Sequence, residues 1–430
     1  MKKRKTALFL TAAMTLALAG CGGKAEPEAT TAAAAGTESA QKADGGGEFS
    51  YPMTAGDALT YWCELQGTVS PNYSNLGETP FAKTWMKETG VDIEFMHPPT
   101  GQVKEQFSLI LADGNLPDMM EYTWIKDYPG GPEKAIKDGV IIPLNDVFEQ
   151  YCPNITAYLK EHPEVDKMIK TDDGHYYVFP FIRGDEKLCN TIGLMLRQDW
   201  LEELNLEVPE TIDEWHTVLT AFKNEKGVAA PYCPEWTRED FKDNDPFAYA
   251  FNTCRSFYLG DDGKVKFGAV EENYKKYLEL MNQWYAEGLI DPDMATLKFD
   301  QVSAKMTNGS AGVSIGFAGS RMGAWITAAQ ANDPNYMLVA APYPTLEKGA
   351  KPEFGQMDNQ YPGTASVAIT TSCKDVERAA RLLDYAYGEE GHMLFNFGVE
   401  GESYEMKDDY PTYTDWVMKN PDGWPVSQAM

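Results

Sequence analysis

The sequence predicts an α/β fold built in two lobes, and three observations support this prediction. Predicted strands and helices alternate where the apolar part of the chain begins, which is typical of a sheet flanked by helices. About 380 residues follow a polar N-terminal segment, and this is more than one hydrophobic core usually organises. No apolar run of about 18 residues occurs in that region, so we expect it to be soluble.

Short apolar runs and helix-capping residues define the first elements. The helix at 79–90 is indicated by Thr79 and Pro80 at its start and by Gly90 at its end. The helix at 103–112 is indicated by its apolar spacing. In chain order, the sequence predicts a strand at 58–63, a helix at 79–90, a strand at 91–95, a helix at 103–112 and a short strand at 119–120.

The rest of the chain continues the same alternation. A turn at 172–174 leads into the apolar run 176–180, which predicts a strand that Pro180 stops. Residues 309–319 are rich in Gly and Ser around an apolar centre, which predicts a strand followed by a tight loop. The predicted helices are 199–205, 209–222, 274–287, 375–387 and 391–397.

The N-terminus has the pattern of a secretory signal. A basic start at residues 2–5 precedes an apolar run to Ala19, and Leu18-Ala19-Gly20-Cys21 forms a lipobox. We therefore expect residues 1–20 to be a signal peptide and Cys21 to receive a lipid anchor at the extracellular face of the cell membrane. Residues 21–50 contain almost no large apolar side chain, so we expect a disordered tether.

Charge and cysteine content exclude some classes of protein. Cleavage removes four basic residues, so that 33 basic residues remain against 65 acidic ones and the formal charge becomes −32. Nucleic acid is not expected as a partner, because its phosphates are bound by Lys and Arg. Six cysteines besides Cys21 are widely spaced without a Cys-x-x-Cys pair, which argues against zinc and leaves open whether they form disulfides. We expect no metal and no cofactor.

Eight short runs, taken in this order, carry a resemblance to a known family. They are 79–83 (TPFAK), 89–95 (TGVDIEF), 111–118 (LADGNLPD), 173–180 (DGHYYVFP), 196–206 (LRQDWLEELNL), 209–215 (PETIDEW), 285–292 (YAEGLIDP) and 397–402 (FGVEGE). Together they resemble the extracellular solute-binding proteins of ABC importers, family 1 (carbohydrate-type), and within it the lipoprotein subgroup of Gram-positive bacteria.

The resemblance implies a fold and a mode of action. It implies a two-lobe periplasmic-binding-protein-like fold of type II, with mixed sheets flanked by helices and a hinged cleft that closes on a solute. The implied crossovers lie near 179–181 and 342–366. The implied regions are 51–180 for the first part of lobe 1, 181–345 for lobe 2, 346–405 for the return to lobe 1 and 406–430 for a C-terminal segment.

Two features depart from the family pattern. Many relatives carry a longer loop resembling a calcium loop after the Asp-Glu-Trp helix, whereas 236–245 holds three Asp without the glycine turn. The sequence therefore leaves calcium binding open. Relatives are also expected to continue with more helices beyond Met430, so truncation at that residue stays open as well.

A sugar site needs aromatic faces for the rings and polar groups for the hydroxyls, and the predicted strand ends supply both. Trp62 and Arg183 have alternative interpretations as a core residue and as the partner of a surface acid. Trp124 is predicted to bind ligand, so the Trp124→Ala variant should lose affinity with little loss of fold. Phe317 and Arg321 are the favoured candidates in the second lobe, because the glycines of the loop 316–319 let the backbone approach a ligand closely. The candidate ligand-binding residues are Trp62, Glu64, Glu121, Tyr122, Trp124, Phe181, Arg183, Tyr232, Trp236, Phe317, Arg321, Asp358 and Tyr361.

These observations favour a lipid-anchored monomer that captures a solute, most simply an oligosaccharide, and passes it to the permease subunits of an ABC importer. Uronate-containing sugars and peptides stay open as substrates, and a peptide-binding lipoprotein is the alternative within the same class. A glycoside hydrolase would need two carboxylates facing each other across a cleft, and the sequence carries no catalytic motif. We therefore expect no enzymatic activity.

Overall fold

The fold is described from a computed structural model, which covers residues 49–430 except 68, 356–358, 423 and 425. The chain divides into two units after Phe49, and everything below concerns the unit Ser50–Met430. The signal sequence, Cys21 and most of the tether lie outside the described residues, as does the candidate Asp358.

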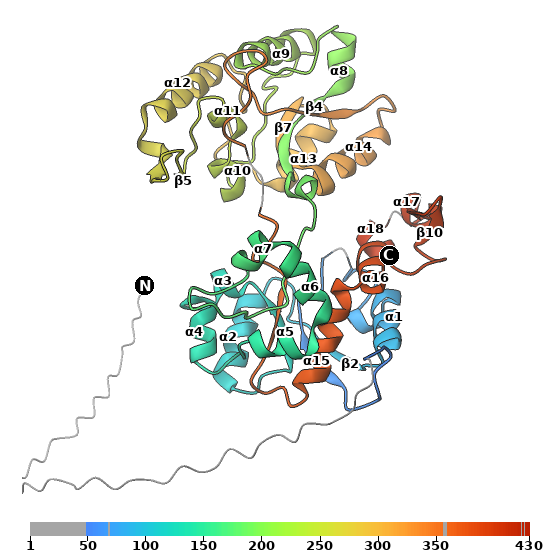
Figure 1. Ribbon diagram of the computed structural model, residues 1–430. Helices are drawn as coiled ribbons and strands as arrows, with labels where there is room; N and C mark the ends of the chain where they lie inside the picture. The colour runs from blue at the N-terminus through green and yellow to red at the C-terminus, as the bar shows by residue number, and fades with distance from the viewer. Residues whose placement is uncertain (1–48, 68, 356–358, 423, 425) are drawn as a thin grey trace, which may run out of the picture. The chain divides into compact units, whose positions relative to one another are not determined.

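A four-stranded sheet organises what we call the first lobe (Figure 1). Its strands are ordered β2-β1-β3-β9, and β1 pairs in parallel with β2 and β3 whereas β9 is antiparallel to β3. Because the three parallel strands share one direction, their carboxyl ends meet at one edge of the sheet. The strands are β1 (Leu59–Trp62), β2 (Ile93–Met96), β3 (Met119–Tyr122) and β9 (Ser366–Ile369).

Helices cover this sheet, and two of them show how the sequence fixes their ends. In α1, the Thr79 side chain accepts a hydrogen bond from the Ala82 amide, and Gly90 ends the helix with a φ of 72°. In α6, the capping carboxylate comes from Asp384 in α15, which accepts bonds from the Asn154 and Ile155 amides. The helices are α1 (Pro80–Thr89), α2 (Val103–Asp113), α3 (Trp124–Asp127), α4 (Gly131–Lys137), α5 (Asn145–Tyr151), α6 (Pro153–Glu161), α7 (Pro163–Met168), α15 (Val376–Asp384) and α16 (Glu389–Phe397).

A three-stranded antiparallel sheet, ordered β7-β4-β8, organises the second lobe. One apolar cluster joins the β4 side chains Leu194 and Leu196 to α9 and α12, and another joins Met195 to α13 and α14. The strands are β4 (Ile192–Arg197), β7 (Val313–Phe317) and β8 (Leu338–Ala341), and the helices are α8 (Gln198–Glu203), α9 (Ile212–Glu225), α10 (Glu239–Asp243), α11 (Pro246–Tyr249), α12 (Glu272–Ala286), α13 (Phe299–Thr307) and α14 (Gly323–Gln330).

Smaller elements complete the chain. A hairpin of β5 (Phe257–Leu259) and β6 (Val265–Phe267) belongs to the second lobe, and β10 (Tyr404–Lys407) and β11 (Tyr410–Tyr413) form a hairpin near the C-terminus. The remaining elements are the short helices η1 (Leu76–Glu78), η2 (Glu186–Cys189), η3 (Gly268–Val270), η5 (Tyr385–Tyr387), α17 (Asp415–Met418) and α18 (Val426–Ala429), and the π-helical turn η4 (Ala318–Met322).

The predicted strand at 176–180 is wrong. Residues 177–179 are buried, but the segment makes only two isolated bridges, between Lys170 and Tyr176 and between Phe179 and Val367. The second bridge brings together the chain leaving the first lobe and the chain returning to it. Four residues after Phe179, the Arg183 amide donates to the Gln360 carbonyl at 3.0 Å, so the two connecting segments still run side by side there.

Candidate functional site

Two predicted acidic residues lie at the edge of the first-lobe sheet where its parallel strands end. Glu64 follows β1 and is exposed, and Glu121 lies half-buried in β3. The Glu121 carboxylate accepts a hydrogen bond from the Tyr61 hydroxyl at 3.0 Å. Burial raises the pKa of Glu121, and the nearby charge of Glu64 raises it further. Both carboxylates can accept hydrogen bonds from a ligand at this edge.

The aromatic candidates at the same edge face the core. Trp62 and Trp124 are 2% and 0% exposed, and Tyr122 stacks on Phe107 with ring centroids 3.8 Å apart. The Trp124 indole N–H donates to the Met120 carbonyl at 3.3 Å. The full burial of Trp124 argues against the expectation that Trp124→Ala would spare the fold, because the residue fills core space and its removal would leave a cavity. We assign these three rings to packing.

The connecting segments contribute three further candidates. Phe181 is 45% exposed, and the Arg183 guanidinium lies 5.8 Å from its ring centroid. Arg183 also donates to the Leu188 carbonyl at 3.2 Å, which fixes it on its own segment. Tyr361 is buried, and its hydroxyl is hydrogen-bonded to that of Tyr177 at 2.8 Å, so it acts as a core residue.

In the second lobe the structure brings Phe317 and Arg321 into one cluster. Phe317 ends β7, and Arg321 lies in the following turn η4. This turn is π-helical, and π-helical turns are frequent at functional sites. Arg321 is buried and forms an ion pair with Glu235, and its guanidinium lies 4.8 Å from the Phe299 ring centroid. Phe317 is half-buried, and the Arg238 guanidinium lies 4.9 Å from its ring.

The other two second-lobe candidates belong to the apolar core of the lobe or pack against it. Tyr232 is fully buried in the core. Trp236 is half-buried, and its indole N–H donates to the Asp245 carboxylate at 3.0 Å. Asp245 also accepts bonds from the Tyr277 hydroxyl and the Phe247 amide, and burial raises its pKa to about 6. Asp245 therefore holds Trp236 in place, and its carboxylate is already engaged by protein donors.

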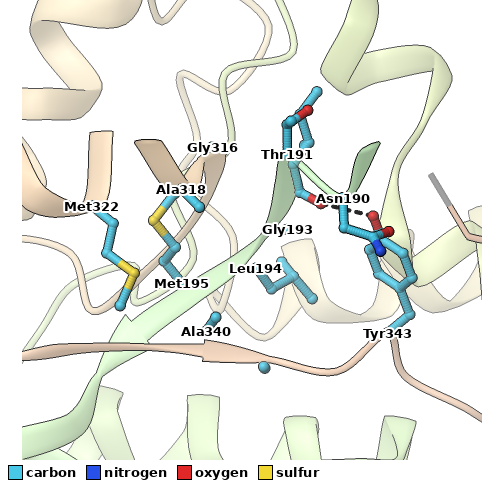
Figure 2. Close-up of a pocket in the computed structure, with 12 residues that line it drawn as sticks. Asn190, Thr191, Gly193, Leu194, Met195, Gly316, Ala318, Met322, Ala340 and Tyr343 are labelled. Carbon is cyan, nitrogen blue, oxygen red and sulfur yellow. Dashed lines mark hydrogen bonds between the residues drawn. The ribbon is translucent and has the colours of Figure 1, made fainter. Parts of the chain in front are cut away.

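A cavity of about 210 Å³ opens over one face of the second-lobe sheet (Figure 2). Small residues line part of it, because Gly193 and Gly316 are paired across β4 and β7 and Ala340 follows in β8. A Cβ atom added at Gly193 would meet no other atom within 4 Å. The lining residues are Asn190, Thr191, Ile192, Gly193, Leu194, Met195, Gly316, Ala318, Met322, Ala340, Ala341 and Tyr343.

Apolar and polar groups line different parts of this cavity. Met195 and Met322 lie on one side, and Asn190, Thr191 and Tyr343 lie on the other. The Tyr343 hydroxyl donates to the Ile192 carbonyl at 2.7 Å, which fixes the ring at the rim. Such a site can hold an apolar face and can hydrogen-bond a polar edge.

The cavity also lies where the connecting segments meet the second lobe. Asn190 and Thr191 immediately precede β4, and Tyr343 follows β8. Ala318 and Met322 belong to η4, which also carries Arg321. The loop 316–319, which we singled out from its glycines, thus forms part of the cavity wall.

Several residues at this site are absent from the sequence-based list. Gly193 had a readable signal, because a glycine inside an apolar strand often marks a close approach of another group to the backbone. Glu235, Arg238 and Phe299 had none, since they reach the cluster from separate parts of the chain. Met195 and Met322 read as ordinary apolar residues.

The described residues contain no group of three or more His, Cys, Asp or Glu side chains that could hold a metal ion. In the segment 236–245, the Asp245 carboxylate is engaged by protein donors and Asp243 pairs with Arg255 at 2.8 Å. The six cysteines after the tether are free thiols, and all are buried: Cys63, Cys152, Cys189, Cys233, Cys254 and Cys373.

Within the described part of the chain, no helix is both long and apolar enough to cross a membrane.

Known proteins match most of this chain. A fructooligosaccharide ABC transporter substrate-binding protein, FusA of Streptococcus pneumoniae, is 26% identical over 419 residues, covering 94% of this chain and 72% of FusA. The lipoprotein LipO of Bacillus subtilis is 24% identical over 364 residues, covering 82% of this chain and 68% of LipO.

A solved structure, that of the alginate-binding protein AlgQ2 without calcium ion, superposes with a TM-score of 0.66 at 26% identity, covering 88% of this chain and 77% of AlgQ2. The fold is therefore the type II solute-binding fold that the family resemblance implied. The family model for bacterial extracellular solute-binding proteins matches residues 74–393. Because this match spans well over half of the 430 residues, the chain belongs to the family of bacterial extracellular solute-binding proteins.

Proposed function

We propose that this chain is the substrate-binding component of an ABC importer and that it captures an oligosaccharide. Its lipobox cysteine, Cys21, carries a lipid that holds the protein at the extracellular face of the cell membrane. The chain delivers its solute to the permease subunits and catalyses no reaction. Family membership and the names of FusA and LipO support the importer and the lipoprotein assignments.

The cavity over Gly193 and Gly316 carries the proposal. A sugar ring has apolar C–H faces and a polar rim of hydroxyls, and this cavity offers methionine side chains together with Asn190, Thr191 and Tyr343. Its volume of about 210 Å³ is suited to one ring rather than to a whole chain. We infer that the cavity holds one monosaccharide unit and that the rest of the oligosaccharide extends past η4.

Exposed and half-buried groups of the second lobe and of the first lobe supply the remaining contacts. Phe317 and Phe299 offer ring faces for stacking, and Arg238 can donate to hydroxyls or to a uronate carboxylate. In the first lobe, Glu64 and Glu121 can accept bonds from hydroxyls. We propose that the solute bridges residues 51–180 and 346–405 on one side and 181–345 on the other. A solute that contacts both sides has a higher affinity for the closed form than for the open form, and it therefore stabilises the closed form.

A thermal-shift screen of the chain from residue 22 onward tests the proposal. The panel contains kestose, alginate oligosaccharides, galacturonate oligosaccharides and short peptides. A solute that binds only the folded protein raises the melting temperature. We expect one glycan class to give a concentration-dependent rise. A rise with peptides alone, or no rise with any glycan on protein shown to be folded, would overturn the oligosaccharide assignment.

A further inference from the structure

The β5–β6 hairpin of the second lobe exposes a row of large apolar side chains. Phe257 pairs with Phe267 and Leu259 pairs with Val265 in the antiparallel register, so all four point to the same face. The two Phe ring centroids are 4.8 Å apart, which confirms this arrangement. The exposed fractions are 70% for Phe257, 69% for Leu259, 72% for Val265 and 40% for Phe267. We call these four residues the hairpin patch.

Isolated exposed apolar residues are ordinary, but a contiguous row of them marks an interaction surface. Val270, just after the hairpin, is 79% exposed and adds to the apolar character of this region. The residues that turn the hairpin are Asp261, Asp262 and Gly263, and the cations Lys264 and Lys266 both lie within 4 Å of Asp262. The patch is therefore apolar, with a rim whose charges largely neutralise each other.

The opposite face of the hairpin contacts the segment that returns to the first lobe. The Tyr258 ring lies edge-on to Phe354 with centroids 4.9 Å apart, and the Tyr258 hydroxyl donates to Glu271 at 2.9 Å. Close by, the Asn252 side chain donates to Glu353 at 2.5 Å. The hairpin thus joins its exposed patch to the segment that returns to the first lobe.

Two other occupants fit the patch less well than a membrane protein. A stable dimer needs about 800 Å² buried on each partner, and the exposed parts of these few side chains fall short of that area. An anionic bilayer surface would be repelled by a chain whose formal charge is −32 after cleavage of the signal peptide. A partner that must release the chain after each delivery of solute can use a smaller surface than a stable dimer needs, because transient complexes bury the smaller interface areas.

We propose that the hairpin patch docks on an apolar extracellular surface of the importer's permease subunit. The inference rests on the proposed importer function, and it assigns the partner to a specific face of the second lobe. Contact between Tyr258 and Phe354 would let docking respond to the position of the return segment.

Photo-cross-linking in intact cells tests this proposal without knowledge of the solute. A benzoylphenylalanine at Val265 of the full-length lipoprotein is irradiated, and the product is identified by mass spectrometry. We expect a cross-link to a membrane-spanning permease subunit. Adding Leu259→Asp should reduce its yield about tenfold, as loss of a central interface contact does. The matched control Leu109→Asp, which changes a leucine that is 60% exposed on α2, should leave the yield unchanged.

The outcomes separate this proposal from the one on which it rests. Cross-linking to a second copy of the chain, to lipid, or to nothing overturns the docking proposal, as does equal yield in the two Asp variants. Unchanged melting temperatures in both variants show that neither has unfolded. If a glycan stabilises the protein while no permease cross-link forms, the docking fails and the oligosaccharide function stands. If a permease cross-link forms while no glycan raises the melting temperature, the docking stands and the oligosaccharide function fails.

Discussion

The carboxylate of Glu235 and the guanidinium of Arg321 form an ion pair inside the second lobe, where the two residues are 6% and 3% exposed. Glu235 belongs to the segment after Tyr232, and Arg321 belongs to the turn η4 that borders the cavity. The pair therefore ties the cavity wall to a separate segment of the lobe. Aromatic rings of Phe241 and Phe299 lie against the guanidinium, each 4.8 Å away.

We predict that Arg321→Met destabilises the protein by about 3 to 5 kcal/mol, because it leaves a buried carboxylate without its partner. The double variant Glu235→Gln/Arg321→Met should regain part of this loss, since no charge is then buried. Urea denaturation of the single and double variants measures both values. A loss below about 1 kcal/mol in the single variant would show that the pair is solvated.

Trp124→Ala should destabilise the first lobe by about 3 to 5 kcal/mol, as large-to-small changes of fully buried aromatic residues do. Protein that remains folded should keep its solute affinity, because the ring faces Phe107 and Tyr128 rather than a ligand. Chemical denaturation and calorimetric titration test the two parts separately. A stable variant with weakened binding would return Trp124 to the site.

The carboxyl group of Asp384 predicts a dependence of stability on pH. Burial raises its pKa in the folded protein from 3.8 to about 6, against the hydrogen bonds from α6 that favour the ionised form. Between pH 4 and pH 6 the folded state then holds more protons than the unfolded state, so its free energy of unfolding falls as the pH rises. The full decrease in the free energy of unfolding, on the order of 2 to 3 kcal/mol, is reached above about pH 6.

Asp384→Asn should remove this component of the pH dependence. Urea midpoints measured from pH 4 to pH 7 for the two proteins give the difference in slope, which is independent of any constant effect of the substitution. We expect the original chain to lose stability relative to the variant across this range. Parallel curves would mean that the Asp384 pKa is not raised in the folded protein.

Cys21→Ser should release the protein from the membrane, because the serine hydroxyl cannot replace the thiol that accepts the lipid. Fractionation of cells into membrane and medium, followed by immunoblotting, measures the distribution. The matched control Cys63→Ser changes a cysteine buried in the first lobe and should leave the protein in the membrane fraction. Retention of both variants at the membrane would contradict lipid anchoring through Cys21.

Local sequence predicted those elements whose ends are fixed by their own residues. The helix at 79–90 is confirmed, since Thr79 caps α1 and Gly90 ends it. The hairpin was missed although an Asp-Asp-Gly turn at 261–263 between alternating apolar residues indicates it. The run 176–180 misled because burial alone does not make a strand; its backbone lacks a continuous partner.

The candidate site was less predictable, because side-chain direction depends on distant residues. Tyr122 turns inward since Phe107 of α2 offers a ring to stack on, and nothing near Tyr122 in the sequence shows this. Phe317 and Arg321 were found from the glycines around them. Gly193 could have been found in the same way, but Glu235 and Phe299 become visible only in the folded chain.

The central claim is that solute occupies the second-lobe cavity, and a titration of Gly193→Leu tests it most directly. The new side chain projects from a position whose Cβ would meet no atom within 4 Å, so it should fill the cavity while the melting temperature is kept. The measurement is isothermal titration calorimetry with the glycan that stabilises the original chain, and Gly67→Leu, also free of Cβ contacts, is the control. We predict an affinity loss of at least about tenfold, or 1.4 kcal/mol, for Gly193→Leu alone. Equal affinity in the two folded variants would contradict the claim.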